Sequence, residues 1–351
     1  MKALVCGYGR MGKCIHNGMQ KLDFEVVAID SYPEANKNFP ETKFICTPEF
    51  QDVEKAINYF QPDILISSLP YHQLLKVAQY AITEGIRYCD LGGRVDVSKK
   101  INDLAAKEAK KPVITDLGLA PGLVNILAEW GYSTVGEGVD TVNMFVGGLP
   151  AIKFNPPLNY AVTWSIDGLI NEYKDDCEVL VDGELKNVAG MEGCQKVDFG
   201  LFEDENLEAF YTSGGAAHTI KTMQERGVKN CSYKTIRYEG HRDLIKWLIR
   251  DCDLTSDCLE SIFATGCQNQ YGDIVLVKAE VKAKDLTWNK EVIVGYDNEF
   301  TAMQKSTSYS IASVAALMGE GKLDGNYNQL NYSDIQFEEF KNNLSKLGIN
   351  I

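Results

Sequence analysis

The sequence contains 351 residues with a formal net charge of −14 at pH 7, and 45% of the residues are hydrophobic and 24% charged. This length suits two or three domains, and the composition is typical of a globular protein. The negative charge argues against a nucleic-acid partner, and the apolar runs are too short to cross a bilayer, so we also expect no membrane partner.

The ten cysteines are scattered singly through the chain, and no C-x-x-C pair occurs among them. Because only four histidines accompany them, we expect reduced thiols and no metal site. Met1-Lys2 runs directly into a strand pattern without a basic leader, from which we expect a cytoplasmic protein.

Strand and helix patterns alternate over residues 1–120. The predicted strands are Lys2–Cys6, Glu25–Asp30, Lys43–Cys46, Asp63–Ser67, Ile86–Asp90 and Pro112–Asp116. The predicted helices are Arg10–Lys21, Pro48–Phe60, Tyr71–Glu84 and Val97–Lys110, and Ser31–Lys43 is predicted to be a loop. This alternation predicts an α/β fold, a Rossmann domain with a doubly wound parallel sheet.

A second, α+β domain is predicted over residues 121–301. Its predicted helices are Leu123–Trp130, Tyr160–Glu172, Thr219–Gln224 and Asp243–Asp251. Asp182-Gly183 predicts a hairpin, and Asp273–Lys282 and Glu291–Tyr296 predict an antiparallel pair around a turn at Asp285–Asn289. The apolar helix predicted over Ser308–Leu317 should return to the first sheet, so that residues 302–351 complete the Rossmann domain, with a short helix near the end.

A dinucleotide fingerprint lies at the start of the chain. The run Gly7-Tyr8-Gly9-Arg10-Met11-Gly12 fits G-x-G-x-x-G between a strand and a helix, and Asp30 closes the next strand. The glycines permit a tight turn, a close approach of the pyrophosphate and close helix packing, while the helix N-terminus favours the anion. Asp30 should bind the ribose hydroxyls and repel a 2′-phosphate, which favours NAD over NADP. The alternative is a glycine turn without a cofactor.

Two further strand ends should lie at the same edge of the sheet. Ser68-Leu69-Pro70 and Asp90-Leu91-Gly92 follow predicted strands, and backbone at this edge commonly passes over the cofactor. The alternative for these segments is an ordinary strand–helix turn.

Several sequence blocks resemble the saccharopine dehydrogenase-like superfamily, most closely its lysine 6-dehydrogenase branch. They are 88–93 (YCDLGG), 116–125 (DLGLAPGLVN), 146–150 (VGGLP), 156–160 (PPLNY), 208–215 (EAFYTSGG) and 233–241 (YKTIRYEGH). The resemblance implies a homodimer with a substrate-binding and dimerisation domain. It also implies oxidation of the side-chain amine of L-lysine with NAD, releasing ammonia and giving 2-aminoadipate 6-semialdehyde, which cyclises. In the saccharopine reductase branch an acid stands in place of Ala120.

Charged residues suggest how an amino acid would be bound and deprotonated. Arg237 could bind the α-carboxylate with its guanidinium fork, or form a cross-strand salt bridge. Asp90 and Asp116 each close a predicted strand and could act as the general base, or cap the following turn. His241 could transfer protons near neutral pH, or simply begin a helix.

Polar residues in the second half of the chain complete the predicted substrate site. Thr212 and Ser213 stand on a Gly-Gly turn and could bind substrate or cofactor, and Tyr160 and Asn125 could line the site. Each of them could equally be structural.

Two alternative functions remain. A reductive condensation of the saccharopine dehydrogenase or carboxynorspermidine synthase type would need a second cation, for which Arg94 and Lys234 are candidates. A non-catalytic NAD-binding regulator would bind the cofactor without turnover.

Overall fold

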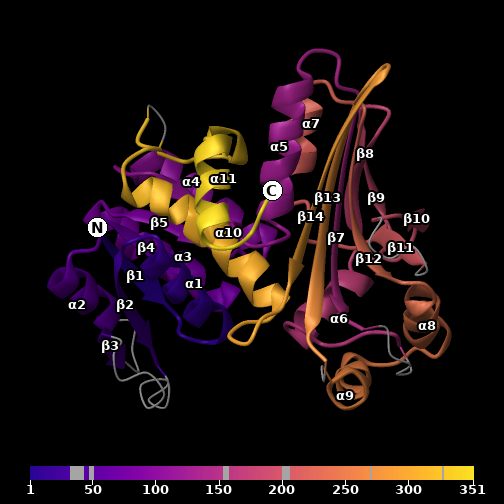
Figure 1. Cartoon of the computed structure of the whole chain (residues 1–351), viewed down its shortest axis with the longest axis horizontal. Coiled ribbons are helices and arrows are strands. Elements are labelled where there is room, and N and C mark those ends of the chain that lie inside the picture. Colours follow the sequence, from indigo (N-terminus) through magenta and orange to yellow (C-terminus); the bar gives the residue numbers. More distant parts are fainter. Residues whose placement is uncertain (32–42, 47–50, 153–157, 200–205, 269–270, 326–327) are drawn as a thin grey trace. The chain divides into compact units, whose positions relative to one another are not determined.

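The computed structural model describes the chain except for residues 32–42, 47–50, 153–157, 200–205, 269–270 and 326–327 (Figure 1). The chain forms two compact units, of which unit 1 comprises Met1–Ile126 and Gln304–Ile351, and unit 2 comprises Leu127–Met303. Most of the loop predicted over Ser31–Lys43 and the start of the helix predicted over Pro48–Phe60 lie outside the described residues.

Unit 1 is built on a parallel sheet, whose described strands follow the order β3-β2-β1-β4-β5-β6. The strands are β1 (Lys2–Cys6), β2 (Glu25–Asp30), β3 (Lys43–Cys46), β4 (Ile64–Ser67), β5 (Arg87–Asp90) and β6 (Val113–Ile114). The strand order reverses between β1 and β4, and ligands bind at the carboxyl ends of strands at such a point. The predicted doubly wound parallel sheet is confirmed.

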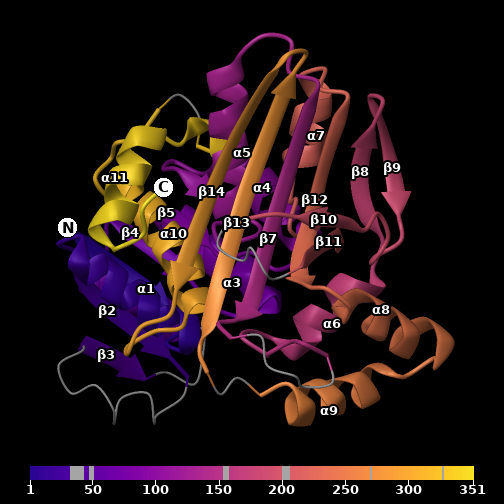
Figure 2. The ribbon, with the colours of Figure 1, turned by 45° about the vertical axis from the view of Figure 1, so that its right-hand side comes forward.

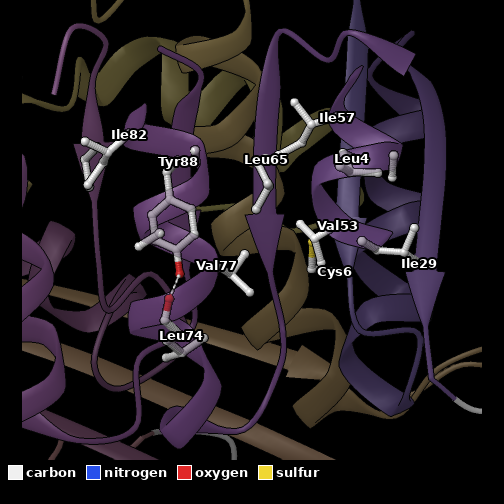
Figure 3. Close-up of a cluster of buried hydrophobic side chains, with 14 of the residues drawn as sticks. Leu4, Cys6, Ile29, Val53, Ile57, Leu65, Leu74, Val77, Ile82 and Tyr88 are labelled. Atoms are coloured by element: carbon white, nitrogen blue, oxygen red, sulfur yellow. Dashed lines mark hydrogen bonds between the residues drawn. The ribbon is translucent and has the colours of Figure 1, made fainter. Parts of the chain in front are cut away.

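The helices α2 (Gln51–Phe60), α3 (Tyr71–Glu84) and α4 (Val95–Glu108) contribute to the core over one face of this sheet. Figure 3 shows Val53 and Ile57 of α2 and Val77 of α3 in one cluster with Leu4 and Leu65 of the strands. Burying each such aliphatic side chain contributes about 1.5–3 kcal/mol relative to exposure, so this cluster anchors the sheet.

The C-terminal part of unit 1 lies against helix α1 (Arg10–Lys21). Tyr309 and Ser308 of α10 (Ala302–Gly319) donate hydrogen bonds to the side chain of Asn17 (3.0 Å) and the carbonyl of Met11 (3.1 Å). A Cβ added at Gly18 would lie 3.0 Å from the ring of Tyr309, so a small residue is needed at this crossing. The helix α11 (Phe337–Lys346) follows and buries Phe340 and Leu344.

Unit 2 is built on a mixed sheet, which in the described part of the chain has eight strands in the order β10-β11-β12-β7-β13-β14, with β8 beside β12 and β9 beside β8 (Figure 2). The strands are β7 (Thr141–Pro150), β8 (Cys177–Val181), β9 (Glu184–Val188), β10 (Gln195–Val197), β11 (Leu207–Tyr211), β12 (Asn230–Tyr238), β13 (Asp273–Ala283) and β14 (Leu286–Gly295). The strands β7 and β12 run parallel, while the other pairs are antiparallel. The predicted α+β domain is confirmed.

The hairpin predicted at Asp182-Gly183 joins β8 and β9. Both residues have a positive φ, 54° at Asp182 and 84° at Gly183, as expected for the turn that suits a two-residue hairpin.

The helices of unit 2 include three that gather at one end of its sheet in Figures 1 and 2, namely α6, α8 and α9. The helices are α5 (Leu123–Val135, which starts in unit 1), α6 (Ile166–Lys174), α7 (Thr219–Glu225), α8 (His241–Lys246, continued by a π-helical turn over Trp247–Asp251) and α9 (Ser256–Gly266).

Local capping moves the start of one predicted helix. The helix expected over Tyr160–Glu172 begins only at Ile166, because the Ser165 side chain accepts a hydrogen bond from the backbone of Gly168 (3.2 Å). Tyr160 therefore lies before the helix, not on it. The helix α9 was not predicted, although Thr255 caps it by accepting from Cys258 (3.4 Å).

Tertiary packing also shortens one predicted turn. Ala283 pairs directly with Leu286, so the turn expected at Asp285–Asn289 is tighter and most of it belongs to β14. Trp288 then packs edge-on against Trp130 of α5, with ring centroids 5.0 Å apart. This contact between two half-buried rings outweighs the polar character of the segment.

Within the described ranges, none of the helices combines the length and the apolar character that crossing a bilayer requires.

Candidate functional site

The glycine-rich bend of unit 1 joins β1 to α1 and has the geometry of a dinucleotide cradle. Gly7 has φ +92°, a conformation that glycine adopts without strain. A Cβ at Gly12 would overlap the carbonyl of Gly7, so the helix can approach the strand only with glycine there. At Gly9 the space within 4 Å is open, and a ligand can therefore reach the backbone at the start of α1. These features fit a nicotinamide dinucleotide.

Asp30 lies at the end of β2, next to the bend. Its Oδ2 accepts a hydrogen bond from the backbone N–H of Tyr8 (2.6 Å), which fixes the carboxylate beside the glycines. Tyr8 in turn packs edge-on against His16 of α1, with centroids 5.5 Å apart. The structure therefore places the predicted ribose acceptor together with the predicted cradle.

The carboxyl end of β4 adjoins the same bend. The Ser68 hydroxyl donates to the carbonyl of Gly7 (3.0 Å) and tethers the bend to the strand end. Leu69 also approaches Gly7, and Pro70 precedes the first turn of α3. The predicted segment Ser68-Leu69-Pro70 is thus at the edge where the fingerprint lies.

Asp90 and Asp116 form one buried network at the ends of β5 and β6. Asp90 accepts hydrogen bonds from the backbone N–H groups of Gly92 (2.8 Å) and Asp116 (3.2 Å) and from the Tyr88 hydroxyl (2.9 Å). Asp116 accepts from the hydroxyls of Ser98 (2.8 Å) and Thr115 (3.1 Å). Every carboxylate oxygen of the pair is therefore hydrogen-bonded within the protein.

Burial weakens the acidity of both carboxyl groups. Desolvation, helped by the charge of Asp116, raises the pKa of Asp90 to about 7. Desolvation raises the pKa of Asp116 to about 6, against the lowering effect of its two hydroxyl donors. At neutral pH the network therefore contains at least one carboxyl group that is partly protonated.

Unit 2 contains a separate polar cluster around Arg237 of β12. The guanidinium is 3% exposed and lies over the rings of Tyr160 and Tyr173, 5.0 and 5.8 Å from their centroids. Its Nε donates to the Tyr173 hydroxyl (2.9 Å) and its Nη1 to the carbonyl of Ile236 (2.9 Å). The described residues give Nη2 no hydrogen-bond partner, so one arm of the fork can serve a ligand.

The cross-strand alternative for Arg237 does not appear among the described contacts. Glu208 of β11 pairs with Arg237 in register, yet its carboxylate accepts from the backbone of Arg242 (2.8 Å) and forms no ion pair with Arg237.

His241 is fully buried at the start of α8, and both of its ring nitrogens have partners. Nδ1 lies 2.7 Å from the carbonyl of Leu158, and Nε2 lies 3.0 Å from the Tyr173 hydroxyl. A carbonyl can only accept, so Nδ1 carries the proton, and Nε2 accepts from a hydroxyl that itself accepts from Arg237. Desolvation and the nearby Arg237 charge lower the pKa of His241 to about 3, so the ring is neutral at physiological pH.

Glu172 of α6 directly precedes Tyr173, whose hydroxyl accepts from Arg237, so it lies half-buried in the same cluster, and it was not predicted. Desolvation raises its pKa to about 7, although the positive charge of Arg237 acts to lower it. Its carboxylate has no hydrogen bond or ion pair among the described residues, while its backbone carbonyl accepts from Ser213 (3.1 Å). The sequence offered no signal for it, because an acid on an amphipathic helix normally faces solvent.

Hydroxyl groups form the remaining part of the cluster. The hydroxyls of Thr212 and Thr235 lie 2.7 Å apart, and that of Tyr233 lies 3.5 Å from Thr235. Tyr233, Thr235 and Arg237 alternate along β12 and share one of its faces. This period of two was visible in the sequence and could have identified Tyr233 and Thr235.

The predicted substrate residues do not all fall in this cluster. Tyr160, Thr212, Arg237 and His241 are brought together in unit 2, with Ser213 beside Glu172. Asn125 belongs to unit 1, where its side chain accepts from the backbone of Gly122 (2.8 Å) at the start of α5.

The two additional candidate cations are engaged elsewhere. Lys234 donates to the carbonyl of Gly193 and the side chain of Gln195, both at 2.6 Å, and lies on the face of β12 opposite Arg237. Arg94 pairs with Asp96 in unit 1 (3.0 Å).

Curated proteins with similar sequences are known. The chain is similar to saccharopine dehydrogenase [NADP(+), L-glutamate-forming] of Pyricularia oryzae, 27% identical over 199 residues, which span 56% of this chain and 44% of that protein. It is similar to the mitochondrial alpha-aminoadipic semialdehyde synthase of Mus musculus, 27% identical over 199 residues, or 54% of this chain and 21% of the relative. The matches therefore span less than half the length of these curated relatives.

A solved structure has a similar fold. The structure resembles an apo saccharopine dehydrogenase (L-Glu forming) from Saccharomyces cerevisiae with a TM-score of 0.74 and 16% sequence identity, covering 99% of this chain and 98% of that one. A family model described as the saccharopine dehydrogenase C-terminal domain matches residues 118–331, more than half of the chain. The chain therefore belongs to the saccharopine dehydrogenase family.

Proposed function

We propose that the protein is a nicotinamide-dependent oxidoreductase that oxidises an amine of an amino acid, and that its substrate is the side-chain amine of L-lysine. Lysine, NAD⁺ and water would give 2-aminoadipate 6-semialdehyde, ammonia, NADH and a proton, after which the semialdehyde cyclises. The observation that carries the oxidoreductase proposal is the bend at Gly7–Gly12, which is open at Gly9 and fixed to Asp30. Membership of the saccharopine dehydrogenase family supports it.

We propose a role for each of the candidate residues within its own unit. The bound nicotinamide would supply the hydride acceptor. Arg237 would bind the substrate carboxylate through Nη2, held in place by Tyr160 and Tyr173. Of the two predicted bases in unit 1, Asp116 suits a proton acceptor better, because a pKa of about 6 leaves its carboxylate largely ionised at neutral pH.

His241 fits a positioning role better than the predicted proton transfer. Its lowered pKa and its two hydrogen-bonded nitrogens keep the ring neutral and fixed. It would orient the Tyr173 hydroxyl, which in turn orients Arg237.

Saccharopine oxidation is the second candidate, and the names of the relatives favour it. Saccharopine carries more carboxylates than lysine, and a second buried cation would be needed beside Arg237. Lys234 lies on the opposite face of β12, and Ala120 stands where the reductase branch carries an acid. These two observations lead us to propose lysine first. A regulator that binds NAD without turnover remains the third candidate.

The test is the reduction of the nucleotide, followed by absorbance, with L-lysine and with saccharopine, each with NAD and with NADP. We expect NADH from lysine and NAD, and a colour reaction with o-aminobenzaldehyde, which traps the cyclic imine. Turnover of saccharopine but not of lysine would establish saccharopine as the substrate. Saturable nucleotide binding without any turnover would establish the regulator instead.

The coenzyme preference has its own test, because the fungal relative is named as an NADP enzyme. Asp30→Asn keeps an acceptor for the Tyr8 N–H but removes the charge that repels a 2′-phosphate. We expect the ratio of kcat/KM for NAD over NADP to fall about tenfold, equal to about 1.4 kcal/mol. An unchanged ratio would remove Asp30 from coenzyme selection. The homodimer, a further proposal from the resemblance, is checked by light scattering after size-exclusion chromatography.

A further inference from the structure

Unit 2 holds two opposite charges in one cluster without pairing them: the guanidinium of Arg237 is buried, and Glu172 is half-buried. Arg237 has a terminal nitrogen with no hydrogen-bond partner among the described residues, and the carboxylate of Glu172 has neither a hydrogen bond nor an ion pair there. The two groups influence each other electrostatically but form no ion pair. A buried cation with an unsatisfied donor is costly, and the half-buried acid beside it supplies the opposite charge, so this arrangement indicates that a ligand with both charges completes it.

We infer that Glu172 and Arg237 together form a two-point site for the zwitterionic end of an L-α-amino acid, with Arg237 binding the α-carboxylate and Glu172 the α-ammonium group. The inference rests on the proposed function for the reaction, but the binding it describes does not need turnover. It makes Glu172 the residue that selects amino acids over carboxylic acids lacking the amine.

The surroundings of Glu172 support this assignment. The charged and titratable groups that act on it are Arg237 and Tyr233 of β12, Tyr160, Tyr173 of α6 and Cys177 of β8. Arg237 is the one cation among these groups, and its guanidinium is already held by Tyr173 and Ile236. A ligand ammonium would therefore supply the charge that the protein does not place against the carboxylate.

The hydroxyl groups beside the two charges suit the same ligand. Thr212 and Thr235 hydrogen-bond each other at 2.7 Å, and either hydroxyl can donate to a carboxylate or accept from an ammonium group. The site would accept the α-amino-acid end of lysine and equally that of a longer molecule built on 2-aminoadipate, so it serves both leading candidate functions.

The experiment compares ligands that lack one group each. Binding to the full-length protein is measured by calorimetry with L-lysine, 6-aminohexanoate, which lacks the α-amine, and pentane-1,5-diamine, which lacks the carboxylate. L-2-aminoadipate and hexanedioate form a second pair, in case the side chain of lysine is not accepted. We expect each amino acid to bind at least tenfold more tightly than its partner without the α-amine.

The variant Glu172→Gln should abolish this discrimination. Its affinity for 6-aminohexanoate should stay within twofold of the unmodified protein, while its affinity for L-lysine falls to the same level. Glu225→Gln, at an exposed acid on α7, is the matched control and should change neither.

The pH dependence gives an independent readout. Since Glu172 has a pKa of about 7, lysine affinity should increase between pH 6 and pH 8 as the carboxylate ionises, and it should be flat in Glu172→Gln. A merely structural role would weaken both ligands equally and leave the pH dependence in place.

Several results would overturn the inference. It falls if Glu172→Gln weakens lysine and 6-aminohexanoate alike, or if the unmodified protein fails to distinguish the members of either pair, a comparison that needs no variant. Discrimination without any nucleotide reduction would overturn the proposed function and leave this site standing. Turnover of lysine without discrimination would overturn this site and leave the proposed function standing.

Discussion

The two units each bury a polar network, and the networks differ in how fully the protein satisfies them. In unit 1 all four carboxylate oxygens of Asp90 and Asp116 accept hydrogen bonds from the chain. In unit 2 Arg237 retains an arm without a partner and Glu172 has none for its carboxylate, among the residues described. The unsatisfied arm of Arg237, and not burial alone, is the observation that favours the cluster of unit 2 for substrate binding.

The largest expected effect is at the glycine bend of unit 1, where one glycine is packed against protein backbone and another faces open space. Gly12→Ala would drive a methyl group into the carbonyl of Gly7, so we expect a loss of at least about 2 kcal/mol in the free energy of unfolding, with nucleotide binding abolished. Gly9→Ala meets no protein atom within 4 Å and should leave the melting temperature unchanged while weakening nucleotide binding. Equal melting temperatures for the two variants would contradict this account of the bend.

The next largest effect is expected at Arg237 in unit 2. Arg237→Lys keeps the charge but loses the planar fork, so we expect KM for the amino acid to rise about 100-fold, or about 3 kcal/mol, with KM for the nucleotide unchanged. Arg250→Ala, which removes a surface arginine paired with Glu192, is the control and should have little effect. A near-normal KM in Arg237→Lys would remove the fork from substrate binding.

The network of Asp90 and Asp116 in unit 1 should make the free energy of unfolding depend on pH. The pKa of Asp90 is raised to about 7 by burial, so the folded protein binds its proton more tightly than the unfolded chain. Its contribution is therefore full below about pH 4 and is lost as the pH rises through 7. Asp90→Asn, which cannot ionise, should flatten this fall by on the order of 4 kcal/mol between pH 4 and pH 8.

That change is measured by urea unfolding across the pH range. A pH profile of stability identical to that of the unmodified protein would show that Asp90 ionises normally.

The smallest expected effect distinguishes a positioning role of His241 from a role in proton transfer. Tyr173→Phe removes the hydroxyl between Arg237 and His241, so KM for the amino acid should rise about tenfold, while kcat and its pH profile change little. His241→Asn, which can still accept a hydrogen bond, should act in the same direction and more weakly. A loss in kcat with a displaced pH profile would instead restore proton transfer to His241.

The sequence predicted unit 1 more completely than unit 2. Strand and helix patterns for β1, α1, β2 and α3 coincide with the structure, and the fingerprint lies where the pattern placed it. The signals there are local, since a glycine bend, a strand end and a helix start follow one another within about thirty residues. In unit 2 the start of α6, the helix α9 and the turn before β14 were missed, because caps and aromatic packing decide them.

By itself the sequence determined the parallel sheet, the nucleotide fingerprint, the family resemblance and the candidacy of Arg237. Tertiary structure alone decided that the hydroxyl of Tyr173, 64 residues earlier in the chain, accepts a hydrogen bond from this arginine, and that Lys234 is engaged by Gly193 and Gln195. Periodicity fixes which face of one element a side chain occupies. The partner it finds there depends on how distant elements pack, and so does the desolvation that alters its charge.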